Sequence, residues 1–247
     1  MSARTVVLTG SGIIDDGWKP IIDVLSDFSG GNVYNADTAN LHLARAVYWA
    51  RMQCVSNPRP SAKFEAAAAE ARRWLALTTD DLAKRIVGYP RPLQGTFDSV
   101  VRRLGLEDTG TTYATTNWDS SLAEKVGSAR VHYFHGSAAS GNLYLPTEMS
   151  IEPYQTNEVT LARVSAHAAL QRLVRSAERV VIWGLGLSPL DAELATILGA
   201  YARDWKRVDI VDPCPHPVVD RLNILAPIFG DLHLWDPNNL EAGPVRR

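Results

Sequence analysis

The sequence predicts an α/β protein with a doubly wound, mainly parallel sheet of the Rossmann type and a helical insertion or cap. Short continuous apolar runs, typical of buried parallel strands, alternate along the chain with segments of helical apolar spacing. Between about residues 37 and 106 the alternation stops, because the pattern there is helical without a convincing strand. We therefore expect a single domain over residues 1–247, with residues 37–106 inserted between the first two strands of the sheet.

The N-terminal half begins with a strand at Thr5–Thr9, followed by Gly10-Ser11-Gly12, here called the first glycine turn. A helix is expected from Trp18 to Phe28, because Ser29-Gly30-Gly31-Asn32 would end it. The insertion is expected to contain helices within the following segments: Thr38–Gln53, which has helical apolar spacing, and Ala62–Leu77, which is rich in strong helix formers.

The C-terminal half resumes the alternation. Further strands are expected at Thr111–Ala114, Val131–Phe134, Asn142–Leu145, Arg179–Trp183, Arg207–Val211 and Ile228–Trp235. Residues 166–177 carry one apolar helical stripe. After Trp183 comes Gly184-Leu185-Gly186-Leu187-Ser188, here called the second glycine turn. Ser188 is a natural N-cap for a helix that starts at Pro189 and runs to about Tyr201.

Composition bounds the class of protein. Hydrophobic residues make up 46% and charged residues 21%, and the formal net charge of -2 gives no footprint for non-specific nucleic-acid binding. No apolar run approaches the ~18 residues of a membrane span, and no signal peptide precedes the first strand. Cys54 and Cys214 alone cannot form a four-cysteine zinc site. We expect a soluble, cytoplasmic protein that binds neither membranes nor, directly, nucleic acid.

The most informative segment is Thr115-Thr116-Asn117-Trp118-Asp119, here called the TTNWD motif, which follows a predicted strand. The next predicted strand ends in His135-Gly136. Open α/β sheets bind ligands at the carboxyl ends of their strands, so Asn117, Asp119 and His135 are expected on one rim. An amide, a carboxylate and an imidazole together can hold a ribose and manage a proton.

Three other strand ends carry groups suited to a nucleotide, each with a plainer alternative. Both glycine turns could let a diphosphate approach the backbone, although Asp15-Asp16 next to the first would repel it. An ordinary strand-to-helix turn explains the first glycine turn equally well, and a role as a simple helix cap explains the presence of Ser188. Asp212 could accept a hydrogen bond from a ribose hydroxyl, or it could initiate the turn before Pro213.

The remaining histidines are interpreted as structural or surface residues: His42, His132, His167, His216 and His233. Trp118 and Trp183 flank the predicted pocket and could stack on a base, but buried tryptophan is the commoner outcome. The sequence contains no nucleophile elbow, P-loop or HExxH motif.

In chain order, the TTNWD motif, His135-Gly136, the second glycine turn and Val211-Asp212-Pro213 resemble the motifs of sirtuin-like NAD-binding domains. The resemblance is strongest to the bacterial sirtuin-like domains that hydrolyse NAD in anti-phage defence, and it covers about residues 1–14 and 108–235. It implies a Rossmann-like sheet with a smaller helical module. It also implies NAD as substrate or ligand, no metal, and assembly into a homo-oligomer or control by a separate regulatory subunit.

By this resemblance Asn117 positions the water or the nicotinamide ribose, His135 is the general base and Asp119 supports the pocket. Ser188 and Asp212 would contact phosphate and the adenosine ribose. The implied nucleotide-binding residues are Gly10, Ser11, Gly12, Thr115, Thr116, Gly136, Gly184, Ser188 and Asp212.

The chain also departs from the family. Gly17-Trp18-Lys19-Pro20 stands where classical sirtuins have a phenylalanine-arginine pair, and the cysteines of a zinc ribbon are missing, which argues against protein deacylation. The expected activity is that of an NAD glycohydrolase, which releases nicotinamide and ADP-ribose. The alternative is a module that binds NAD or ADP-ribose as a sensor without turnover.

Overall fold

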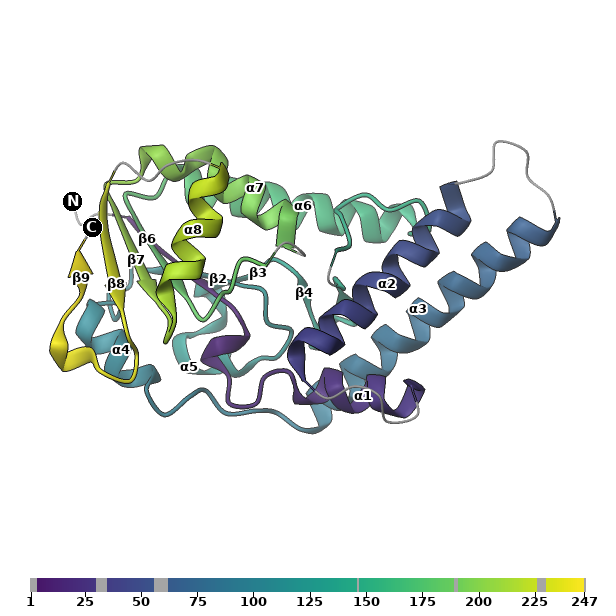
Figure 1. The fold of residues 1–247 in the computed structure, drawn as a ribbon, viewed down its shortest axis with the longest axis horizontal. Helices are drawn as coiled ribbons and strands as arrows, with labels where there is room; N and C mark the ends of the chain where they lie inside the picture. The colour runs from purple at the N-terminus through teal and green to yellow at the C-terminus, as the bar shows by residue number, and fades with distance from the viewer. Residues whose placement is uncertain are drawn as a thin grey trace.

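The computed structural model describes residues 4–29, 35–55, 62–145, 147–188, 191–225 and 230–246. Seven strands form one sheet in the order β3-β2-β1-β6-β7-β8-β9 (Figure 1). They are β1 (Thr5–Thr9), β2 (Thr112–Thr115), β3 (Val131–Tyr133), β6 (Arg179–Trp183), β7 (Arg207–Val211), β8 (Asp231–Trp235) and β9 (Val245–Arg246). All neighbouring pairs are parallel except β8 with β9. The predicted α/β class with a Rossmann-like, mainly parallel sheet is confirmed.

Helices cover both faces of this sheet, which explains why its strands are continuous apolar runs. On one face, Val6 and Leu8 of β1 share a core with α6 (Asn157–Arg175), α7 (Ala192–Tyr201) and α8 (Pro215–Leu225). On the other face, Val7 packs with α4 (Phe97–Leu104) and α5 (Ser121–Val126). Successive β1 residues therefore point into two different cores, and the sheet is doubly wound.

The predicted helical block is a separate layer. It contains α2 (Ala36–Val55) and α3 (Ala62–Gly88), which lie side by side and extend away from the sheet (Figure 1). The helix α1 (Lys19–Ser29), which precedes the predicted block, joins this layer, whereas α4 at the end of the block packs on the sheet. These helices have their own buried core, to which Val24, Leu43 and Leu82 contribute. A short ribbon of β4 (Gly136–Ser137) and β5 (Asn142–Leu143) joins this core through Leu143. That the whole chain is one domain with an insertion stays a prediction.

Some predicted boundaries need correction. The strand expected at Thr111–Ala114 is shifted by one residue, so that Thr115 is its last member. Ser188 is not the N-cap of α7, because that helix starts at Ala192 with Asp191 at the capping position. The chain instead turns at Leu187, which has a φ of 47°, and the Ser188 carbonyl accepts a hydrogen bond from the Asp191 N–H.

Other expectations lie partly outside the described residues. The expected first residue of the helix, Pro189, is not among the described residues. The same holds for Ile228, the expected start of the last strand. The antiparallel strand β9 has no counterpart in the sequence-based expectation, because two residues are too few to form a pattern. None of the helices in the described ranges has both the length and the apolar character that a membrane crossing needs.

Candidate functional site

A pocket with a volume of about 300 Å³ lies at the carboxyl edge of the sheet, between the strand ends and the helical layer. The sheet side supplies Ser11 from the first glycine turn, part of the TTNWD motif and His135. The helical layer closes it with the start of α2 and the end of α3. The lining residues that the sequence analysis proposed are Ser11, Thr116, Asn117, Asp119, His135, Gly184 and Ser188.

The two glycine turns form the base of the site by packing against each other. The Gly12 N–H donates to the Gly184 carbonyl at 2.9 Å. A Cβ on Gly10 would lie 2.6 Å from the Gly184 oxygen, and a Cβ on Gly12 would lie 2.6 Å from the Gly184 Cα. Gly184 also has a φ of 58°, in the left-handed region that favours glycine. Gly10 and Gly12 therefore serve this backbone contact and do not line the pocket themselves.

Asn117 is fixed by hydrogen bonds on both sides. Its backbone N–H donates to Thr115 Oγ1 at 3.0 Å, and its side-chain Nδ2 donates to the Gly10 carbonyl at 2.9 Å. Thr115 is itself buried and does not line the pocket. No residue in the described ranges hydrogen-bonds Asn117 Oδ1. The amide oxygen is thus the group that Asn117 can offer to a ligand, while the amide nitrogen joins the TTNWD motif to the first glycine turn.

The rest of the TTNWD motif surrounds Asn117. Asp119 lines the pocket and also accepts a hydrogen bond from the Ser121 N–H at 2.9 Å, in an Asx turn just before α5. Thr116 Oγ1 lies 3.4 Å from the Thr9 carbonyl. Trp118 lines the pocket, whereas Trp183 is buried and stacks on Phe97 at 4.9 Å between ring centroids. Of the two tryptophans, only Trp118 is placed where it can contact a ligand.

His135 follows β3, and it lines the pocket together with residues of the second glycine turn. Its ring lies 4.8 Å from the Phe134 ring and 5.9 Å from the Tyr144 ring, measured between centroids. Loss of solvation in these surroundings, together with the nearby charge of Arg163, lowers the pKa of His135 to about 4. The imidazole is therefore neutral near pH 7 and has a free nitrogen lone pair. His135 and Asp191 also line a neighbouring cavity of about 630 Å³.

Besides Gly10, Gly12 and Thr115, two further predicted residues, Gly136 and Asp212, lie outside the pocket lining. Gly136 is required by the backbone, because it has a φ of 76° and a Cβ there would come within 1.7 Å of the Asn142 oxygen. Asp212 accepts a hydrogen bond from the Cys214 N–H at 2.8 Å, as the turn-initiating alternative expected. Neither residue is part of the pocket surface.

The hydroxyl groups of the two turns already have partners. Trp18 Nε1 donates to Ser11 Oγ at 2.8 Å, and Ser188 Oγ donates to Asp191 Oδ2 at 3.2 Å. Burial raises the pKa of Asp191 above its ordinary value, and the hydrogen bonds from Ser188 and the charge of Arg221 offset only part of that rise. A ligand phosphate would therefore meet Ser188 next to a carboxylate.

Several lining residues were missed by the sequence analysis, because no local pattern marks them as pocket residues and chain packing brings them to the site. They include Trp18, Asp37, Asn40, Tyr89, Arg91, Tyr144, Asp191 and Arg221. Arg221 on α8 donates from Nη1 to the carbonyl of Gly186. An isolated arginine on an exposed helix face carries no pattern from which this contact could be read.

The other histidines have structural surroundings or lie away from the pocket. His132 Nε2 is 2.9 Å from the Ala166 carbonyl, and burial lowers its pKa. His167 Nδ1 lies 3.4 Å from Glu193 Oε1 beside the neighbouring cavity, and His233 is mostly buried next to Asp209. In the part of the chain that the structure describes, no three His, Cys, Asp or Glu side chains are grouped as a metal site.

The fold and the pocket together define a Rossmann-like α/β protein with a polar site at the carboxyl edge of its sheet. No family model matches the sequence, and no curated protein matches it. Among solved structures, a Sir2 enzyme is similar at 17% identity, with 91% of this chain and 90% of that chain covered and a TM-score of 0.41. A point mutant of a Sir2 homologue in complex with ADP-ribose is similar at 17% identity, with 86% and 82% covered and a TM-score of 0.37. At this identity function must follow from the residues of the site.

Proposed function

We propose that this chain binds NAD in the carboxyl-edge pocket and hydrolyses its nicotinamide–ribose bond, giving nicotinamide and ADP-ribose. One observation carries the proposal: Asn117 and His135, which follow neighbouring strands, line the same pocket as the second glycine turn. A glycine turn suits the diphosphate, and the amide and imidazole suit the reacting ribose.

The proposed reaction passes through an oxocarbenium-like state, because nicotinamide leaves as a neutral base from a cationic nucleotide. Water then attacks the ribose carbon from which nicotinamide departs, and His135 takes the proton that the water loses. Asn117 Oδ1 orients the water or the ribose. The carboxylate of Asp119 favours the developing positive charge. A neutral His135 at pH 7 is in the protonation state that a base needs, although its low pKa makes it a weak one.

A second candidate function is binding of NAD or ADP-ribose without turnover. The observation that favours it is the hydrogen bond from Asn117 Nδ2 to Gly10, which gives Asn117 a structural reason to be present. The low pKa of His135 favours it too, because a weaker base removes a proton less readily. If the chain is a hydrolase, the corresponding physiological role is that of an effector that depletes NAD, as in the anti-phage domains that the motifs resemble.

The test is to incubate the purified protein with NAD at neutral pH and follow nicotinamide and ADP-ribose by chromatography. His135→Ala should abolish release, whereas His216→Ala, at an exposed position on α8 outside the pocket, should leave it unchanged. Binding is measured in parallel by calorimetry with ADP-ribose. Binding without release would support the sensor, and neither binding nor release would overturn the assignment of the pocket to NAD.

A further inference from the structure

The pocket has a direction that follows from the strand order. His135 comes after β3, Asn117 after β2, the first glycine turn after β1 and the second after β6. Arg221 lies on α8, which follows β7, the next strand in the sheet. The guanidinium of Arg221, held at Gly186 after β6, is therefore separated from the end of β3, where His135 lies, by the ends of β1 and β2. A dinucleotide whose nicotinamide ribose meets His135 would extend its phosphates toward Arg221.

The guanidinium of Arg221 is held against the second glycine turn. Its Nη1 donates to the Gly186 carbonyl, and it lies 3.7 Å from the position that a Cβ of Gly186 would occupy. Within the described ranges the Gly186 carbonyl is the only hydrogen-bond acceptor of this side chain, so other N–H groups of the fork remain for a ligand. Helix α8 is itself fixed, since Val218, Val219 and Leu222 are buried in the core of the sheet.

The charges around the pocket give Arg221 a specific task. Asp37, Asp119 and Asp191 line the pocket, and its arginines are Arg91 and Arg221. The Arg91 carbonyl accepts from Ser121, which places Arg91 near the Asp119 end. Next to the second glycine turn, Arg221 is thus the cation that can offset Asp191 and the negative charge of a phosphate.

We propose that Arg221 is the phosphate-binding residue of this site, with its guanidinium bonded to the nucleotide phosphates while Nη1 holds the Gly186 carbonyl. This rests on the proposed function in so far as the ligand is a nucleotide. Arg221 also supplies a positive charge beside the glycine turns, which the loop after β1 does not, because that loop carries Asp15 and Asp16. Charge-assisted hydrogen bonds from a planar guanidinium are the usual means of holding phosphate oxygens.

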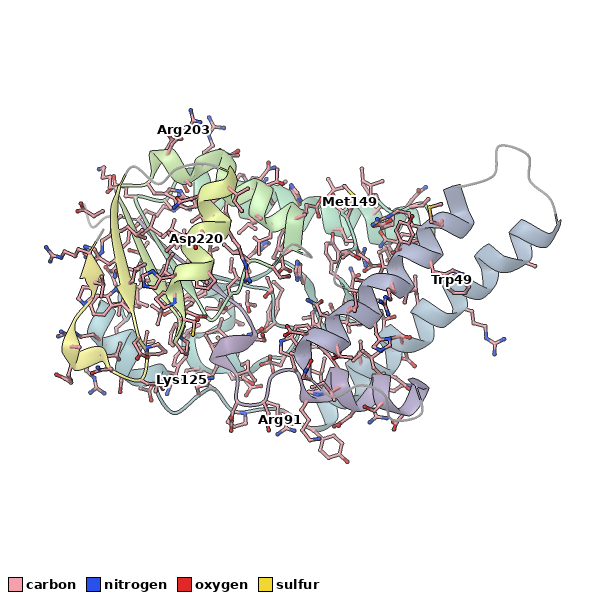
Figure 2. All side chains as sticks on the ribbon, in the orientation of Figure 1. Trp49, Arg91, Lys125, Met149, Arg203 and Asp220 are labelled. Carbon is pink, nitrogen blue, oxygen red and sulfur yellow. The ribbon has the colours of Figure 1, made fainter. Side chains whose placement is uncertain are left out.

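The test separates the phosphates from the rest of the nucleotide. Adenosine, AMP, ADP and ADP-ribose are titrated calorimetrically into wild type, Arg221→Gln and Arg221→Lys. Arg221→Gln should weaken ADP and ADP-ribose by roughly tenfold or more and adenosine by less than about threefold. Arg221→Lys should restore part of the loss, because it keeps the charge without the fork. Arg203→Gln, at an exposed arginine outside the pocket (labelled in Figure 2), is the matched control and should bind like wild type.

The salt dependence gives a second readout that does not need adenosine binding to be strong. Affinity for ADP-ribose should fall more steeply with NaCl in wild type than in Arg221→Gln, because one fewer ionic contact remains to be screened. A variant that loses adenosine and ADP-ribose affinity equally, with unchanged salt dependence, would show that Arg221 only shapes the turn and would overturn the proposal. Normal ADP-ribose binding by Arg221→Gln would overturn it while leaving NAD binding intact. If wild type binds none of the four ligands, the proposed function itself fails.

Discussion

Gly12 and Gly184 are in direct backbone contact: the Gly12 N–H bonds the Gly184 carbonyl at 2.9 Å, and a Cβ on Gly184 would lie 2.6 Å from the Gly12 carbonyl carbon. Two turns that are 172 residues apart, by subtraction of the residue numbers, therefore form one surface. Each was ambiguous as a sequence motif. The contact explains why both carry glycine even where the residue does not touch the pocket.

Replacement of Gly184 by alanine should destabilise the protein and disturb nucleotide binding together. The left-handed φ alone costs roughly 1–2 kcal/mol for a residue with a Cβ, and the clash with the Gly12 backbone adds to that. Gly105→Ala is the matched control, since Gly105 has a φ of 65° but nothing within 4 Å of its Cβ position. Urea unfolding should show a clearly larger loss of unfolding free energy for Gly184→Ala. Equal losses in the two variants would mean that the turns separate easily.

Much of the fold could be predicted because its strands are buried on both faces. Thr5–Thr9, Arg179–Trp183 and Arg207–Val211 match observed strands residue for residue, since a short apolar run bounded by polar residues has few other structures. The start of α7 was misplaced by a good local capping signal at Ser188. The left-handed Leu187 and the turn to Asp191 depend on how the chain passes over β6, which local sequence does not encode.

The site was predictable only where it follows strand ends. Asn117, Asp119 and His135 were expected on one rim, and the parallel register of β2 with β3 brings them to one pocket. The α2 and α3 residues that close the pocket, and Arg221, come from helices whose orientation depends on tertiary packing. Asp212 shows that a strand end alone is not enough to predict a site residue. It follows β7, where an acidic residue could bind a ribose, but its carboxylate accepts a hydrogen bond from the following turn.

Asn117→Ala should lower the rate of NAD hydrolysis roughly 100-fold, the order of loss expected when reacting atoms are misplaced by about 1 Å. Affinity for ADP-ribose should fall less than about tenfold, because in the described residues no hydrogen bond joins the Asn117 side chain to Arg221 or to the second glycine turn. Single-turnover kinetics and calorimetry measure the two effects. Asn40→Ala is the control, since Asn40 lines the same pocket from α2 and has no proposed role in the reaction. A rate loss of equal size in both variants would remove the special role of Asn117.

The pH dependence of hydrolysis should reflect the lowered pKa of His135. With a pKa of about 4, the imidazole is already neutral at pH 5.5, roughly, so kcat/KM should lose activity only as the pH falls toward about 4. An ordinary histidine base would lose activity near ~6.5. The rate profile from pH 4 to 8 measures this, with His132→Gln as a control for the half-buried histidine of the preceding strand β3. An inflection near 6.5 that persists in His132→Gln would contradict the lowered pKa of His135.

The same shift predicts how His135 affects stability. Its folded pKa lies below that of a histidine in the unfolded chain, so the unfolded chain takes up the proton first as the pH falls. Stability should therefore decrease with acidification from about 6.5 to about 4, and His135→Gln should make this part of the curve shallower. Urea midpoints measured across that range give the comparison. An unchanged slope in the variant would show that the imidazole is protonated as readily in the folded protein as in the unfolded chain.

Asp209 should be the acidic residue of the sheet whose replacement or protonation lowers the free energy of unfolding most. It is fully buried in β7 and accepts hydrogen bonds from Arg179 Nε at 2.7 Å, Arg207 Nη2 at 2.8 Å and Trp235 Nε1 at 2.8 Å. Burial alone would raise its pKa, but the bonds from Arg207 and the charge of Arg179 outweigh that effect and lower it. Its contribution to stability is therefore present above the unfolded pKa of about 3.9 and is lost as the pH falls through the folded pKa.

Asp209→Ala should accordingly reduce the free energy of unfolding by about 3 kcal/mol at pH 7, since it leaves two arginines without their shared carboxylate. Asp231→Ala, at the exposed start of the neighbouring strand β8, should change it by less than about 0.5 kcal/mol. Guanidinium chloride would screen these charges, so urea is the denaturant for both variants. The difference between the two should shrink below about pH 4, where the carboxylate of Asp209 begins to be protonated in the unfolded chain. A difference that is absent at pH 7 would mean that water replaces the carboxylate without loss.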